Sequence, residues 1–288
     1  MSPARRRVAV KYLRRKFKVS ERRACRVVGQ HRSSNRYAPV APDFEKRLVK
    51  EMTRLSLRHP RYGYRRVHAL LVADGWEVNV KRVERLWRRE GLRVPARRGP
   101  NGQRAIGGDA NSAWARPATR PVHAWSYDFV SLRTTRGAPV RVLNVVDEFT
   151  KIAYPPLVQP SIGAADVIEH LKVLFEEHGT PQMIRSDNGR EFIAETVKTF
   201  LGRAGCTPVF IAKGRPQQNC YVERFNGSMR DEAITGESFE TVLEARVVLT
   251  GWVQEYNHER PHRSLNMRTP AAFLAYCLAH PPLDGQCP

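Results

Sequence analysis

The sequence predicts a five-stranded mixed α/β sheet with flanking helices, preceded by a basic region that is all helical. Charge is the first observation behind this division. Residues 1–104 contain 30 Lys and Arg against 8 Asp and Glu, whereas residues 105–288 contain 19 against 20, so the net charge of +21 comes from the first third of the chain. The second observation is composition: residues 94–121 are rich in Pro, Gly and Arg without periodicity, which is typical of a linker.

Helix signals fill the basic region, residues 1–93. Ser20 is a candidate N-cap and Gly29 a candidate stop for one helix, and "PDFEKRLVKEMTRLSLRHP" predicts another that Pro60 closes. "YGYRRVHALLVADG" and "NVKRVERLWRREG" then predict two helices joined by a short turn, with apolar stripes that face one another. This pair is similar to a helix-turn-helix, in which the second helix would read a DNA groove. A solvated basic face is the alternative.

A basic region joined to a near-neutral domain is typical of a protein that binds a polyanion with the basic region and carries out its activity with the other domain. Arg outnumbers Lys, which suits forked contacts to phosphate. We therefore expect a nucleic acid partner; a merely basic surface or an RNA binder of the ribosomal type is the alternative. The candidate DNA contacts on the predicted helix pair are Arg65, Arg66, Lys81, Arg82, Arg85, Arg88 and Arg89.

Other classes of protein fit the sequence poorly. It has no apolar run long enough to predict a transmembrane helix, and its basic N-terminus lacks the apolar segment of a signal peptide. The five cysteines are scattered without a C-x-x-C pair, which suits a reducing cytoplasm and argues against a structural zinc site.

The sequence pattern changes from helical to β-type after residue 121. Three β-type runs, "HAWSYDFVSL", "RVLNVVDEFT" and "KIAYPPLV", precede an amphipathic helix in "GAADVIEHLKVLFEEHG". A strand in "PQMIRS", a helix from about Glu191 to Leu201, a strand in "PVFIA" and a helix containing Glu223 follow. This order predicts a mixed sheet with helices on its faces. We expect it to occupy residues 122–235, with a helical extension, residues 236–288, packed on it.

Three acids stand out within this domain. Asp128 lies in mid-strand, on the face opposite Trp125 and Tyr127, so it is a lone charge that needs a cation or strong hydrogen-bond donors. Asp187 ends the fourth predicted strand, just before an Asn-Gly turn. Glu223 lies on a helix whose apolar face is formed by other residues, Val222, Phe225 and Met229.

Three carboxylates without a nearby set of His or Cys suit hard cations such as Mg²⁺ or Mn²⁺. Two such ions would serve phosphoryl transfer, because one lowers the pKa of an attacking water or sugar hydroxyl and the other stabilises the leaving oxygen. The cations would also offset the repulsion among the carboxylates. Without them, at least one of the three acids should have a raised pKa.

Asp128, Asp187 and Glu223, with 35 residues between the last two, resemble the D-D-E triad of retroviral-integrase-type transposases, and Arg230 fits the basic position that follows the Glu on the same helix face. Longer sequence motifs extend the resemblance: "HPRYGYRRVHALL", "WSYDFV", "VVDEFT", "SDNGREF", "GRPQQNCYVERFNGSMRDE" and "YNHERPHRSLNMRTPAAF". From about residue 5 to residue 277, the chain resembles the second-reading-frame (OrfB) transposase of the bacterial insertion sequence 3 family.

This resemblance implies a ribonuclease-H-like integrase core that holds two Mg²⁺ ions, for which Mn²⁺ would substitute. It implies cleavage of the element's ends and attack of the freed 3′-hydroxyl on another phosphodiester. It further implies a homo-oligomer on double-stranded DNA, an upstream-frame (OrfA) partner, separate or fused, and a cytoplasmic, nucleoid-associated location. A catalytically inactive DNA-binding remnant or regulator, or a nuclease for RNA–DNA hybrids, is the alternative.

Further polar residues flank the predicted metal site, and we expect them to contact the phosphate backbone: Asn188, Lys213, Arg215 and Asn219, together with Arg230. Asp147 and Glu148 could rival the triad, but a role in a turn or in supporting the site is favoured. For His258 and His262, in "HERPH", a structural turn is favoured over DNA contact. Cys220 stands where the resemblance predicts a small residue.

Overall fold

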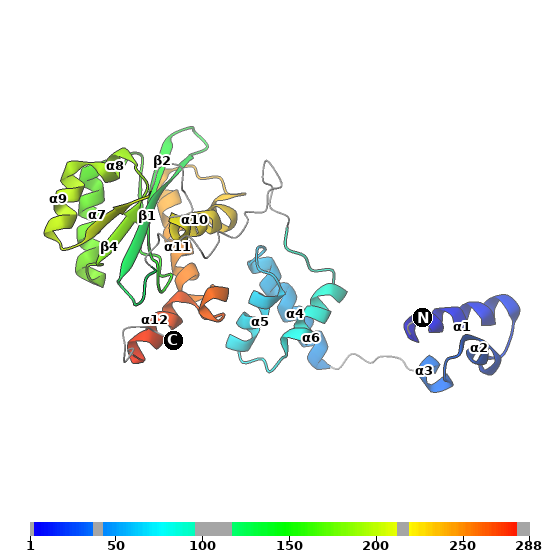
Figure 1. Cartoon of the computed structure of the whole chain (residues 1–288). Coiled ribbons are helices and arrows are strands. Elements are labelled where there is room, and N and C mark those ends of the chain that lie inside the picture. The colour runs from blue at the N-terminus through cyan, green and yellow to red at the C-terminus, as the bar shows by residue number, and fades with distance from the viewer. Residues whose placement is uncertain (1–2, 37–42, 96–116, 212–218, 281–288) are drawn as a thin grey trace. The chain divides into compact units, whose positions relative to one another are not determined.

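The computed structural model describes residues 3–36, 43–95, 117–211 and 219–280, whose helices and strands are shown in Figure 1. The chain divides into two compact units, Met1–Glu51 and Met52–Pro288, and each is described by itself. Most of the predicted linker, residues 94–121, lies outside the described residues. Across the described ranges, no helix is both long enough and apolar enough to cross a membrane.

The first unit is built around a small apolar core. Its helices are α1 (Pro3–Phe17), α2 (Glu21–Val28) and α3 (Arg32–Arg36). The buried side chains of this core are Val10, Ala24 and Cys25. The predicted helix signals are confirmed, because the Ser20 side chain accepts a hydrogen bond from the backbone N–H of Arg23 and Gly29 ends α2 with a φ of 65°.

The second unit begins within α4 and continues with the predicted helix pair. The helices are α4 (Asp43–Arg58), α5 (Tyr64–Ala73) and α6 (Val80–Arg89). α5 and α6 pack against one another and bury apolar side chains that include Val67, Leu71, Val83 and Leu86. Asn79 caps α6 by accepting a hydrogen bond from the backbone N–H of Lys81 at 2.8 Å.

A five-stranded mixed sheet forms the centre of the second unit, in the order β3-β2-β1-β4-β5. The strands are β1 (Ala124–Arg133), β2 (Pro139–Asp147), β3 (Leu157–Gln159), β4 (Met183–Ser186) and β5 (Thr207–Phe210). β1, β2 and β3 are antiparallel to their neighbours, whereas β1, β4 and β5 run parallel. β1 is therefore central, and the end of β4 lies next to it.

Helices cover both faces of this sheet, as Figure 1 shows, and the predicted fold class is confirmed. The helices are α7 (Ala164–His178), α8 (Arg190–Ile193), α9 (Glu195–Arg203), α10 (Cys220–Met229), α11 (Val242–His258) and α12 (Pro270–Ala279). α7, α8 and α9 pack on the face of β1 that carries Trp125 and Tyr127. α10 and α11 pack on the face that carries Val130. The alternation along β1 thus separates two apolar cores.

Two predicted elements differ in detail. The expected helix from Glu191 to Leu201 is two helices, α8 and α9, because Ala194 between them has an extended ψ of 134°. The run "KIAYPPLV" forms only the three-residue β3 and an isolated bridge from Ala153 to Val146. Two prolines separate these pairings, and proline has no N–H to give to a ladder.

Candidate functional site

Asp128 lies near the middle of β1, opposite Asn144 of β2, with its carboxylate half-buried. Its Oδ2 accepts a hydrogen bond from Nδ2 of Asn226 on α10 at 2.8 Å. The Oδ1 of Asn226 accepts in turn from Nδ2 of Asn144 at 2.7 Å. This chain of hydrogen bonds joins the helix to two strands, so the packing of α10 on the sheet sets the direction of the Asp128 carboxylate.

Asp187 follows β4 directly, at the edge of the sheet where β1, β4 and β5 run parallel. Its Oδ1 accepts a hydrogen bond from the backbone N–H of Gly189 at 2.9 Å. A side chain at position 189 would bring its Cβ within 2.9 Å of the same oxygen, so the turn requires glycine for close approach. Asn188 donates from Nδ2 to the carbonyl of Ile211 at 2.9 Å, which ties the turn to the chain after β5. One oxygen of Asp187 therefore serves the turn.

Glu223 lies in the first turn of α10 and is exposed, whereas Val222, Phe225 and Met229 on the same helix are buried. The helix thus has the apolar face that the sequence predicts. Residues that bury one stripe of a helix direct the remaining positions away from it. Because α10 packs on β1, Glu223 is presented near Asp128.

The electrostatics connect the three acids. Burial raises the pKa of Asp128, and the charge of Asp187 raises it further, although hydrogen bonds from Phe129 and Asn226 act in the opposite direction. Burial also raises the pKa of Glu223, with the charge of Asp128 as the second cause. Asp128 is therefore linked electrostatically to both of the other carboxylates. The sequence predicted a raised pKa from repulsion among the carboxylates, whereas burial is the larger cause of both shifts.

The donor set fits a hard divalent cation. All the donors are carboxylate oxygens, and two of the three acids have raised pKa values that a cation would lower. The charge of Arg230 lowers the pKa of Asp128. The carboxylates of the triad are not among the sets of three ligand groups that lie within 4.8 Å of one another in the described structure. They form a shared acidic site rather than a single compact cage.

The predicted DNA contacts fall into distinct environments. On α5 and α6 the exposed ones are Arg65, Lys81, Arg82, Arg85, Arg88 and Arg89. Arg88 pairs with Glu84 at 2.6 Å, and Arg89 pairs with Glu90 at 2.8 Å.

Arg66 differs from these residues, because it is half-buried, 5.1 Å from the centre of the Tyr62 ring and 3.9 Å from Glu232. Asn188 and Arg230 are exposed, and Asn219 is only 2% exposed. Lys213 and Arg215 lie outside the described residues.

Asp147 and Glu148 support the site rather than line it, as the sequence favoured. The Asp147 carboxylate accepts hydrogen bonds from the backbone N–H groups of Val122, Phe149 and Thr150. Glu148 pairs with Arg185 at 2.9 Å, and both side chains are buried. The pair joins the end of β2 to β4, next to the strand end that presents Asp187.

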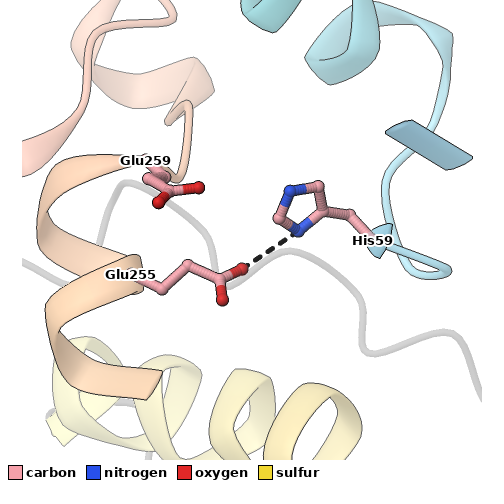
Figure 2. Close-up of side chains that lie close together, drawn as sticks. All are labelled: His59, Glu255 and Glu259. Atoms are coloured by element: carbon pink, nitrogen blue, oxygen red, sulfur yellow. Dashed lines mark ion pairs between the residues drawn. The ribbon is translucent and has the colours of Figure 1, made fainter. Parts of the chain in front are cut away.

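Sequence reasoning missed a second acidic group, which Figure 2 shows. His59 Nδ1 lies 3.0 Å from Oε1 of Glu255, and Arg58 pairs with Glu259 at 2.7 Å. The hydrogen bond with His59 is the main cause that lowers the pKa of Glu255. These pairs connect the end of α4 to the end of α11. An imidazole and two carboxylates are possible metal ligands, but Arg58 already supplies a cation to Glu259.

Three regions of the chain match protein-family models. Residues 118–216 and residues 204–270 match two models described as integrase core domain, and residues 43–100 match an HTH-like domain. The matched core contains Asp128, Asp187 and Glu223. The fold and these matches define a protein with an integrase core and a helix-turn-helix-like module.

Comparison with individual proteins defines the family. The chain is 38% identical over 264 residues to an uncharacterized 31.7 kDa protein of insertion element IS407 from Burkholderia multivorans, covering 91% of this chain and 93% of that protein. It is 34% identical to an uncharacterized 39.2 kDa protein of insertion element IS476 from Xanthomonas euvesicatoria, covering 96% of this chain and 78% of that protein. It is 27% identical to the transposase InsF for insertion sequence IS3A from Escherichia coli, covering 74% and 76%. The chain belongs to the insertion sequence 3 family of integrase-core transposases.

Among solved structures, the chain is similar to the catalytic core domain of HTLV-2 integrase in complex with magnesium. The TM-score is 0.44 and the identity 15%, over 55% of this chain and 99% of that domain.

Proposed function

We propose that this transposase cleaves the ends of its insertion sequence and joins the freed 3′-hydroxyl to DNA at Asp128, Asp187 and Glu223, with two Mg²⁺ ions or with Mn²⁺ in their place. The observation that carries the proposal is the electrostatic coupling of the three carboxylates, in which the charge of Asp187 raises the pKa of Asp128 and the charge of Asp128 raises the pKa of Glu223. Asp128 lies in β1, Asp187 follows the neighbouring β4, and Glu223 lies on α10, which packs on β1 and β2; the three match the D-D-E pattern of the family.

The side chains have separate tasks in this mechanism. Asp128, oriented by Asn226, and Asp187, fixed by the Gly189 turn, would hold the cations from the sheet, and Glu223 would hold one from α10. The bound ions would activate the attacking oxygen and stabilise the leaving oxygen of an in-line displacement. Arg230, beside Asp128, would offset negative charge on the phosphate that lies there.

We assign DNA binding to the basic face of α5 and α6, with α6 as the helix that enters the groove. Its contacts would come from Lys81, Arg82, Arg85, Arg88 and Arg89, with Arg65 on α5. Arg66 is a weaker candidate because of its contacts with Tyr62 and Glu232. The same proposal includes phosphate contacts near the triad from Asn188, Lys213, Arg215, Asn219 and Arg230.

The proposed assembly is a homo-oligomer on double-stranded DNA of the bacterial nucleoid, with an upstream-frame (OrfA) protein as a further partner. Residues 1–93 would bind DNA, residues 94–121 would link, residues 122–235 would form the catalytic core, and residues 236–288 would extend it. The packing of α11 on the sheet supports the last assignment.

A plasmid nicking and strand-transfer assay with Mn²⁺ or Mg²⁺ tests the proposed chemistry. We expect metal-dependent joined products from the wild-type chain, none from Asp187→Asn, and wild-type amounts from Glu176→Gln, an exposed acid on α7. Full activity of Asp187→Asn would contradict the assignment. If the wild type is inactive alone, the assay is repeated with the upstream-frame protein. Inactivity there, with DNA binding retained, would favour a binding-only remnant.

A further inference from the structure

Lys151, in the loop after β2, has a strained backbone. Its φ is 65°, in the left-handed region that glycine and asparagine adopt more readily than lysine. The loop is held firmly there, because the backbone N–H of Lys151 donates to the carbonyl of Asp147 at 3.0 Å and the Asp147 carboxylate accepts the neighbouring N–H groups. The chain carries a lysine where glycine would fit the backbone without strain. The lysine side chain therefore has a role that offsets the backbone strain.

The ammonium group of Lys151 is partly buried and has a defined position. It donates to the carbonyl of Glu148 and lies 3.9 Å from the centre of the Tyr221 ring on α10. Burial lowers its pKa to about 8, against the opposing charges of Glu148 and Asp147. The carboxylate of Glu148 is engaged by Arg185. No ion pair joins Lys151 to a carboxylate in the part of the chain that the structure describes, so the ammonium keeps hydrogen-bonding capacity for an anion.

Lys151 lines a groove of about 1000 Å³ that also contains Glu223 of the triad. Tyr221 and Arg224 continue the α10 side of this groove, and Arg263 lies on another side. Six of the lining side chains are Arg or Lys and three are Asp or Glu, so the groove is basic although it reaches the acidic site. A groove of this charge suits the backbone of a nucleic acid.

We propose that Lys151 is a positioning residue that binds a DNA phosphodiester adjacent to the scissile one, in the groove beside Glu223, with Arg224 continuing the path of the strand. This inference rests on the proposed function, because Glu223 marks the place of the scissile phosphate. A phosphate contact fixes the register of the strand without reading its sequence. Lys151 would thus place the reacting phosphodiester at the triad and take no part in the chemistry.

The first test measures the salt dependence of DNA binding. Lys151→Gln removes the ammonium, and Lys151→Gly removes it while relieving the backbone, so a thermal melt of the glycine variant confirms that the fold persists. The probe is a fluorescein-labelled duplex with the terminal sequence found in the DNA flanking the gene, in EDTA to prevent cleavage. The slope of log K against log salt concentration should become shallower by about 0.9 in both variants. Lys172→Gln, an exposed lysine on α7, should leave it unchanged. A wild-type slope in both Lys151 variants would overturn the proposal.

The second test locates the contact. Neutral methylphosphonates are placed one at a time along the duplex, and the position that weakens wild-type binding next to the cleavage site should have no effect in Lys151→Gln. If every position keeps its wild-type effect in that variant, Lys151 is structural and the proposal fails. Full strand-transfer activity of Asp187→Asn would instead contradict the proposed function. If Asp187→Asn is inactive but both Lys151 variants bind DNA with the wild-type salt dependence, only the role of Lys151 is contradicted.

Discussion

The carboxylate site and the basic face of α6 hold their charges in opposite surroundings. Asp128 and Asp187 are partly buried at the sheet, and each is fixed by a hydrogen bond, from Asn226 and Gly189 respectively. Lys81 and Arg85 on α6 are exposed to solvent, where salt screens them. Each fixed carboxylate therefore affects the site through its own position, whereas the exposed cations of α6 contribute to DNA affinity through their total charge. Substitutions should therefore have large local effects at the first site and small, salt-dependent effects at the second.

Glu148→Gln is expected to have the largest effect on stability, because it leaves Arg185 as a buried charge without its partner beneath the strand end of Asp187. Removing one partner of a buried ion pair costs about 3–5 kcal/mol. Urea denaturation followed by circular dichroism measures this loss, with Glu176→Gln on the surface as the control. A loss of under about 1 kcal/mol would show that water reaches Arg185 and that the support of the site is less buried than the structure indicates.

Asn226→Ala should have the second-largest effect, and it should lower activity rather than stability. The substitution removes the donor to Asp128 and the oxygen acceptor of Asn144, which keeps only its weaker contact with the sulfur of Met229. Loss of a residue that orients a metal ligand costs about 10–100-fold in metal affinity or activity. We expect strand transfer to require more Mn²⁺, measured as the metal concentration at half-maximal rate. An unchanged metal requirement would mean that Asp128 holds its direction without Asn226.

The contacts of Asn226 also show where sequence reasoning stops. Alternation along β1 predicted that Asp128 faces away from Trp125 and Tyr127, and helical spacing predicted the apolar face of α10. Both are local periodicities that burial imposes on a strand or a helix. The bond between Asn226 and Asp128 joins residues 98 apart, and it depends on how the helix packs across the sheet. Periodicity gives the face on which Asn226 lies but not the partner that it meets.

Two other features were beyond the sequence for related reasons. The break at Ala194 between α8 and α9 has no proline or glycine to signal it, so it follows from tertiary packing. The pairing of His59 with Glu255 joins segments that are far apart in the chain. The acids themselves were found because a charge in an apolar strand, or at the end of one, is costly without a ligand. The sequence therefore predicts the candidate catalytic acids better than it predicts the residues that position them.

On α6, Arg85→Gln should lower DNA affinity only a few-fold at low salt, and the effect should fade as salt rises. An exposed cation that contacts one phosphate contributes about 0.9 to the slope of log K against log salt concentration. A double variant with Lys81→Gln should add a similar decrement, which a fluorescence titration on duplex DNA would measure. A loss confined to one DNA sequence would instead make Arg85 a base-reading residue and remove it from the summed basic face.

Glu255→Gln should have the smallest effect. Because His59 lowers the pKa of Glu255, the pair stabilises the fold above the usual carboxyl pKa of 4.5 and loses this contribution as the pH falls through the lower, folded value. Glu255 is about a third exposed, so solvent weakens the pair to roughly 0.2–1 kcal/mol. Thermal melts at pH 6 should place the variant slightly below the wild type, and the difference should disappear on acidification below pH 4.5. A difference that persisted in acid would show that Glu255 stabilises α11 through packing rather than through its charge.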